Sequence, residues 1–207
     1  MKSLLKNSAV ALVVVLLLSS CAKTFYSVDS KTLAQRHQSV AVMPSFVSIS
    51  PKGANKKVAS EVLERQETVE SLNFQQSIHA WLQRSKSDGK LTISIQNIET
   101  TNAKLKSVGY PETLLTDAKI CEVLGVDGII VSNFELSKPF STSESIALGI
   151  STNVWVNTDE IKAILGISDC ANGKTIWSYE QKISGNDSRT IVDKFMKKAG
   201  KKMPYVK

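Results

Sequence analysis

VDGIIVSNFEL, residues 126–136, is the stretch that most constrains the fold. It is a long segment with an apolar centre and is rich in β-branched residues, which favours a strand. Gly125 stands directly before it and suits the end of a helix that runs up to Leu124. The stretch therefore predicts a helix leading into a long strand, as in α/β proteins.

Downstream of this strand, the sequence predicts a hairpin followed by a helix. Residues 160–168 alternate between apolar and polar positions, which is typical of a strand with one buried face. Asn172-Gly173 tolerates the positive φ angles of a tight turn, and residues 175–183 form the return strand. Asn186 or Asp187 then caps a final helix over residues 188–201.

Upstream, apolar periodicity predicts two further strands and three helices. Residues 40–44 are a short buried strand that proline closes, and residues 57–85 have the period of a long helix. Residues 91–95 alternate as a strand, and residues 97–106 suit a short helix. Pro111 suits the first turn of the helix that ends at Leu124. The order predicts a single-domain α/β sandwich, with a mixed β-sheet flanked by helices.

The amino terminus has the pattern of a secretory signal peptide. Lys2 and Lys6 precede an uncharged apolar run over residues 9–18. This run is too short to cross a bilayer, which takes roughly 20 apolar residues. It ends in Leu18-Ser19-Ser20-Cys21, which resembles the bacterial lipobox. We therefore expect a signal peptide over residues 1–20 and lipidation of Cys21.

The lipobox implies a membrane anchor made of acyl chains. The Cys21 thiol would carry diacylglycerol, and the amine freed by cleavage would take a further chain such as palmitate. Ala22 lacks the aspartate of the inner-membrane retention rule and so favours the outer membrane; the inner membrane and the cell surface stay open. Residues 21–38 lack a clear apolar period, which predicts a lipidated tether for the domain over residues 39–207.

Charge and aromatic residues suggest a surface for a partner. The chain of 207 residues has a formal net charge of +7, and much of the excess lies near its end. Export makes nucleic acid an unsuitable partner, whereas anionic lipid or cell-wall polymer fits a basic patch. A solvated helix face is the alternative. The candidate partner surface comprises Trp155, Lys197, Lys198, Lys201 and Lys202.

Two cysteines remain besides Cys21. Cys121 and Cys170 would lie in an oxidising compartment, where disulfides persist. Their spacing does not distinguish a bridge from two unpaired thiols.

Three segments resemble the superfamily of curli-secretion lipoproteins and penicillin-binding-protein activators. They are LGVDGIIVSNFEL at residues 124–136, the hairpin at residues 161–180 and AVMP at residues 41–44. In the hairpin, Asp169, Gly173 and Trp177 stand where members carry aspartate, glycine and tryptophan. The resemblance implies a fold like the amino-terminal domain of the translocation protein TolB.

The sequence offers no constellation for catalysis. The two histidines are His37, in the expected tether, and His79, on a helix flank. There is no paired-histidine metal spacing, CxxC, P-loop, GxGxxG or Gly-x-Ser-x-Gly motif. We therefore expect no enzyme activity, no metal and no cofactor.

Together these patterns predict a lipid-anchored, non-catalytic binding or assembly module of the cell envelope. Its partner would be a periplasmic or outer-membrane protein. The alternative is a homo-oligomeric component of an outer-membrane secretion or pore-associated assembly.

Overall fold

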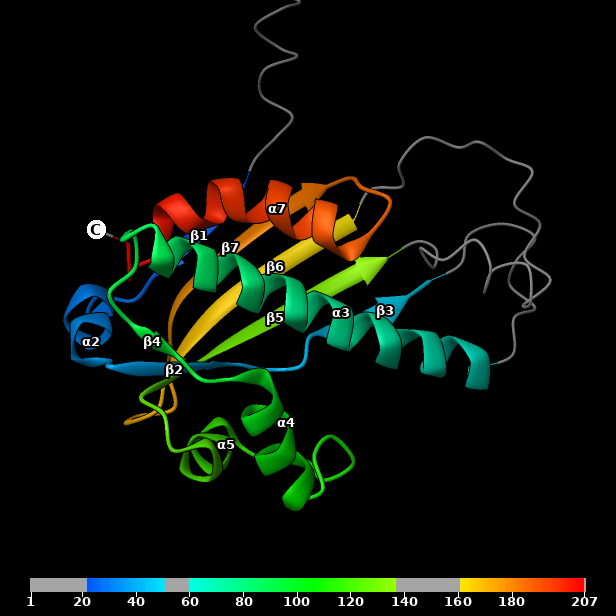
Figure 1. The fold of residues 1–207 in the computed structure, drawn as a ribbon, viewed down its shortest axis with the longest axis horizontal. Coiled ribbons are helices and arrows are strands. Elements are labelled where there is room, and N and C mark those ends of the chain that lie inside the picture. Colours follow the sequence, from blue (N-terminus) through cyan, green and yellow to red (C-terminus); the bar gives the residue numbers. More distant parts are fainter. Residues whose placement is uncertain (1–21, 51–59, 137–160, 207) are drawn as a thin grey trace, which may run out of the picture.

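The structure, a computed structural model, describes residues 22–50, 60–136 and 161–206. These residues form one mixed seven-stranded sheet in the order β1-β7-β6-β5-β2-β4, with β3 also paired to β5. Helices α3 and α7 lie across one face of the sheet, and α4 and α5 lie together near β2 (Figure 1). The predicted α/β sandwich with a mixed sheet is confirmed.

The described residues form seven strands and five helices. The strands are β1 (Lys23–Tyr26), β2 (Ser39–Val42), β3 (Phe46–Ile49), β4 (Ser94–Ile95), β5 (Gly128–Leu136), β6 (Ile161–Asp169) and β7 (Thr175–Ile183). The helices are α2 (Ser30–Arg36), α3 (Ser60–Ser87), α4 (Ile98–Ser107), α5 (Asp117–Leu124) and α7 (Ser188–Ala199), followed by the 3₁₀ turn η2 (Gly200–Lys202).

Strand β5, which lies within the stretch VDGIIVSNFEL at residues 126–136, is the centre of the sheet. One side of it pairs antiparallel with β6, and the other side pairs parallel with β2 and then β3. Strands β2 and β3 pair with successive parts of β5 and are separated around Pro44, which has no N–H to donate to a neighbouring strand. The apolar centre of β5 is therefore covered by a strand on each side.

The hairpin and the last helix form as the sequence predicts. Strands β6 and β7 pair antiparallel, and Gly173 in the turn between them has a φ of +67°. The side chain of Asp187 accepts the backbone N–H of Thr190 and so caps α7. Gly125 ends α5 in the left-handed conformation.

The core lies mainly between the sheet and helices α3 and α7. Phe74 of α3 stacks on Phe134 of β5, with ring centroids 3.7 Å apart, and Phe195 of α7 meets Phe134 edge to face. A smaller cluster on the other side packs Ile129 of β5 against α5, through residues such as Leu124. The sheet thus has a helical layer over much of one face and a smaller helical layer at the β2 end.

Two elements differ most from their predicted bounds. Helix α5 begins at Asp117 and not at Pro111, because the Thr116 side chain accepts the N–H of Lys119 and caps the helix there. The strand expected over residues 91–95 is reduced to β4. Leu91 instead forms an isolated bridge with Val206 near the end of the chain.

The segment expected to be a tether is folded over most of its length. Lys23–Tyr26 pairs antiparallel with β7, and the Tyr26 hydroxyl donates to the Lys202 carbonyl at 2.6 Å. Helix α2 follows at once, and Ala22 already packs against the core. These elements are too short to show an apolar period. The fold therefore begins directly after Cys21, with little chain between them.

Candidate functional site

The predicted surface lysines lie on the last helix and the turn after it. Lys197 and Lys198 belong to α7, Lys201 and Lys202 belong to η2, and all four are exposed. The apolar residues of α7 face the core, which places these lysines on its outer sides. Trp155 and the lipobox residues Leu18, Ser19, Ser20 and Cys21 lie outside the described residues.

A groove of about 940 Å³ runs between α3 and α7. Its walls come from the last turns of α3, the outer side of α7, η2 and the end of the chain. The residues that line it include Trp81, Arg84, Asp88, Lys90, Asp193, Lys194, Met196, Lys197, Lys201 and Val206. Two of the four predicted lysines therefore belong to one concave surface.

The floor of the groove depends on a close approach between Trp81 and Gly200. A Cβ at residue 200 would lie 2.3 Å from the Trp81 ring, so a larger residue requires the ring to move. Met196 is buried beside them. The floor is thus apolar, with an aromatic ring held in place by the backbone of η2.

The charges around the groove are mostly positive. Arg84 pairs with Asp193, and a separate ion pair joins Lys90 to Asp88, each at 2.7 Å. Across the described part of the chain, Lys197 and Lys201 have no hydrogen bond or ion pair. The groove therefore combines an apolar floor with two uncommitted ammonium groups, a chemistry suited to an acidic, partly apolar peptide segment.

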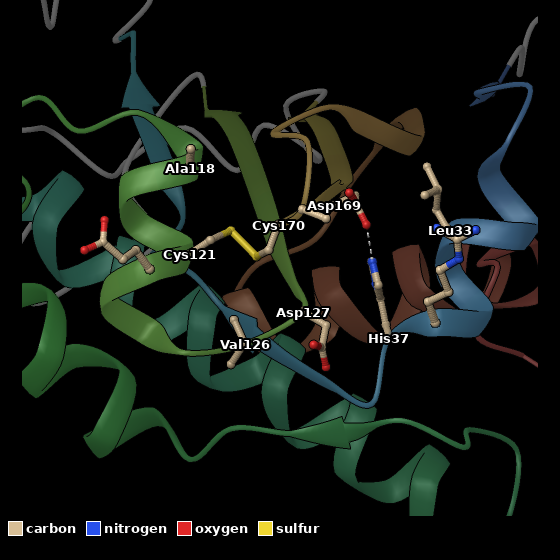
Figure 2. Close-up of a pocket in the computed structure, with 11 residues that line it drawn as sticks. Leu33, His37, Ala118, Cys121, Val126, Asp127, Asp169 and Cys170 are labelled. Atoms are coloured by element: carbon tan, nitrogen blue, oxygen red, sulfur yellow. Dashed lines mark hydrogen bonds and ion pairs between the residues drawn. A yellow bond between two sulfur atoms is a disulfide. The ribbon is translucent and has the colours of Figure 1, made fainter.

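A second hollow, of about 410 Å³, lies beside the disulfide (Figure 2). Cys121 of α5 and Cys170, just after β6, form this bridge, with their Cα atoms 5.4 Å apart. Of the two states that the sequence left open, the structure shows the bridged one. The bond ties the small helical layer to the β6–β7 hairpin.

A buried polar cluster, here called the polar clasp, forms one side of this hollow. His37 lies between two partners: its Nε2 is 2.7 Å from the Asp169 carboxylate, and its Nδ1 is 2.6 Å from the Tyr205 hydroxyl. When Nε2–H donates to the Asp169 carboxylate, Nδ1 of the neutral ring accepts a hydrogen bond from the Tyr205 hydroxyl. The clasp joins the residue after α2, the end of β6 and the end of the chain.

Sequence reasoning missed this cluster. His37 was assigned to the tether, and its partners lie 132 and 168 residues away. In the fold, a Cβ at Gly128 would lie 2.8 Å from the His37 ring, so the glycine leaves room for the imidazole. Asp169 also accepts the N–H of Asn172 in the hairpin turn, which is a sufficient local reason for an aspartate there.

The polar clasp has the connectivity of a nucleophile, base and orienting acid, but not the electrostatics. Burial, together with the charges of Asp169 and Asp127, holds the pKa of the Tyr205 hydroxyl far above its ordinary value. A nucleophilic hydroxyl needs the opposite shift or access to a substrate, and Tyr205 is only 5% exposed. The arrangement suits a structural connection between three segments.

Near the clasp, Asp127 fastens the start of β2. Its carboxylate accepts the N–H groups of Gln38 and Ser39, each at 2.9 Å, and the Ser39 hydroxyl at 3.1 Å. Burial alone raises the pKa of Asp127, but these hydrogen bonds and the neighbouring His37 outweigh it, so the pKa is lowered.

This lowered pKa predicts a loss of stability in acid. The contribution of Asp127 is fully present above the ordinary aspartate pKa of about 4 and is lost as the pH falls through the lower folded value. In urea titrations, Asp127→Asn should be less stable than the wild type at neutral pH, and the difference should shrink in acid. Asp29→Asn is the control, since the Asp29 carboxylate accepts no capping hydrogen bond from α2. Equal pH profiles for wild type and Asp127→Asn would contradict the assignment.

His79 and the acidic residues show no further site. His79 is half-buried on α3, where burial lowers its pKa against opposing effects of the Gln96 backbone and Glu99. No group of three or more histidine, cysteine, aspartate or glutamate side chains able to hold a metal occurs among the described residues. Of the helices in that same part of the chain, none is both long and apolar enough to span a bilayer.

Comparison with known proteins gives matches among solved structures only. No protein-family model matches the chain, and no curated protein matches it in sequence. Lipoprotein GNA1162 from Neisseria meningitidis is similar at 14% identity and a TM-score of 0.44, over 80% of this chain and 94% of that chain.

Two other solved structures extend this set. The LpoB C-terminal domain from Escherichia coli matches at 13% identity and a TM-score of 0.37, over 75% of this chain and 96% of that chain. The PelC dodecamer from Paraburkholderia phytofirmans matches at 9% identity and a TM-score of 0.37, over 91% and 99%. At these identities and TM-scores the matches carry no argument about the function of this chain.

Proposed function

We propose that this protein is a lipid-anchored, non-catalytic binding module of the bacterial envelope, at the outer membrane. Residues 1–20 are removed as a signal peptide, and Cys21 carries diacylglycerol and a further acyl chain such as palmitate. The observation that carries the proposal is the junction of lipobox and fold: β1 begins at Lys23, two residues after the cysteine.

This short junction limits how far the domain can move from the membrane. Two residues of extended chain span only about 7 Å, so the domain stays against the lipid headgroups and does not move freely above them. Confinement to a surface raises the effective concentration of the domain near any partner held at the same membrane. The anchor therefore contributes to binding without touching the partner.

The binding surface of the proposal is the groove between α3 and α7. Its Trp81 floor offers apolar contact, and Lys197 and Lys201 offer charge, as described above. We assign it to an acidic segment of a periplasmic or outer-membrane protein. The polar clasp adds no catalytic role, because the Tyr205 proton is held tightly inside the fold.

Cross-linking in intact cells tests anchor and groove together. A photo-reactive residue at Lys194, which also lines the groove, should capture one discrete partner in the wild type. Cys21→Ser should lose the acyl mass, leave the membrane fraction and lose most of the capture, because the domain is no longer concentrated there. Lys197→Glu with Lys201→Glu should keep the acyl mass and the membrane but lose the capture.

Matched variants separate these effects from misfolding. Ser20→Ala keeps a small residue before the cleavage site and should be processed like the wild type. Lys106→Glu with Lys119→Glu makes the same charge change on α4 and α5, away from the groove, and should keep the capture. If Cys21→Ser keeps both its mass and its membrane fraction, the anchor is elsewhere. If the groove variant captures the same partner, the groove is not the binding surface.

A further inference from the structure

Three large apolar side chains are exposed at the start of the fold. Phe25 is 51% exposed, Tyr26 is 48% exposed, and Val28 in the turn after β1 is fully exposed. They lie within four residues of one another, on the edge strand β1 and the turn that follows it. A soluble surface seldom gathers apolar side chains in this way without a contact to make.

The two aromatic rings flank the sheet edge from opposite faces. Tyr26 pairs with Trp177 and shares its face, where the Tyr26 hydroxyl bonds the Lys202 carbonyl. Phe25 pairs with Ser178 and points to the other face. The edge of β1 therefore carries a ring on each side, and both rings can meet a flat surface that approaches the edge.

A basic rim surrounds these rings. Lys23 on β1 has a side chain that is 77% exposed, and the Lys202 ammonium lies beside the strand, 3.2 Å from the Thr24 hydroxyl. Lys198 precedes Lys202 by about one helical turn and is exposed on α7. Two acidic groups lie nearby, Glu180 at 3.9 Å from Lys23 and the exposed Asp29. Three lysines against two carboxylates leave the rim positive, so its charge complements an anionic surface.

We propose that this β1-edge surface, formed by Lys23, Phe25, Tyr26, Val28, Lys198 and Lys202, docks on anionic lipid headgroups. The rings would lie at the interfacial depth that aromatic side chains prefer, and the lysines would meet phosphate groups. The orientation rests on the proposed acylation of Cys21, since the chain enters the fold beside these residues. The headgroup chemistry rests only on the exposed side chains.

This docking fixes which side of the domain faces the lipid. Strands β1 and β4 are the two edges of the sheet. In the proposed orientation the β1 edge faces the lipid and the β4 edge faces away from it. In Figure 1 β1 lies on the same side of the molecule as α7, opposite to α4 and α5. The smaller helical layer and the disulfide would then point away from the membrane.

Vesicle binding without the acyl chains tests the proposal independently of the anchor. The protein is the chain from residue 21 onward with Cys21→Ser, which retains every described helix and strand. Co-sedimentation compares vesicles of phosphatidylcholine with vesicles that also contain phosphatidylglycerol. We expect binding that requires phosphatidylglycerol and weakens with salt.

Two variants and their controls locate the surface. Lys198→Gln with Lys202→Gln should weaken binding roughly thirtyfold, since each basic residue at such a surface contributes roughly fivefold. Phe25→Ser should weaken it roughly tenfold through the lost ring. The controls are Lys106→Gln with Lys119→Gln, and Phe46→Ser on β3, where the phenylalanine is 67% exposed. Both should bind like the parent protein.

The outcomes separate this proposal from its competitors. Equal binding to both vesicle types, no binding, or equal losses in variants and controls would overturn it. Light scattering measures the oligomeric state of the same proteins. If the parent protein is a dimer, Phe25→Ser makes it a monomer and neither binds vesicles, the surface belongs to a contact with a second copy of this chain. Loss of the anchor itself would show separately, as missing acyl mass in the wild type.

Discussion

Replacing Asp169 with alanine is expected to lower the free energy of unfolding by about 3–5 kcal/mol. The carboxylate is buried and accepts from His37 Nε2 and from the Asn172 backbone, so its removal leaves the His37 donor unpaired inside the fold and takes a hydrogen bond from the hairpin turn. The His37 and Asp169 side chains are 2% and 4% exposed, so water cannot replace the lost partner. Urea unfolding of the oxidised protein measures the change.

A surface ion pair supplies the matched control. Asp193 pairs with Arg84 at the same distance of 2.7 Å, but the two side chains are about half exposed. Asp193→Ala should therefore cost no more than about 1 kcal/mol. Asp169→Asn should fall between the two, because the amide keeps the volume and part of the hydrogen bonding. If Asp169→Ala and Asp193→Ala cost the same, the polar clasp does not stabilise the fold.

Removing the disulfide is expected to cost about 4 kcal/mol, from the entropy of a loop closed across 49 residues. The bridge joins α5, a helix that packs on the sheet, to the residue just after β6, a strand of that sheet. Cys121→Ala with Cys170→Ala should lower the urea midpoint without changing the final fold. Reduction of the wild type should lower its midpoint by a similar amount.

Reductant provides the internal control for this prediction. The double variant has no bridge to break, so its midpoint should be the same with and without reductant. Free thiols counted in the unfolded wild type should be none at residues 121 and 170 before reduction. Two reactive thiols there, or a wild-type midpoint that reductant leaves unchanged, would show that the bridge does not form.

The centre of the fold could be predicted from sequence because its signals are local. Strand β7 has the predicted bounds, and β5 and β6 differ by no more than two residues at their ends. Each has a periodic or apolar run long enough to distinguish strand from helix. Gly125 marks the end of the helix before β5, and Asn172-Gly173 marks the turn between β6 and β7. The sequence likewise offered Asn186 or Asp187 as the cap of α7, and the structure shows Asp187.

The edge strand β1, the polar clasp and the disulfide have no such local signals. Strand β1 has four residues and gains its stability from β7, so nothing in its own sequence distinguishes it from a tether. The polar clasp needs three residues that only the folded chain brings together. The disulfide is of the same kind, because spacing alone does not pair two cysteines. The lysines of the groove were chosen from sequence, but their relation to Trp81 came from the packing of α3 on α7.

The pairing of β1 with β7 also sets an order of events during synthesis. In a chain that crosses a membrane from its amino terminus, β1 emerges long before β7. Strand β1 therefore stays without its partner until β7 has been translocated, since contacts between distant segments form late. Under the proposed lipidation of Cys21, the lipid would be attached before this pairing forms, and the closed sheet edge would then hold the modified residue close to the membrane.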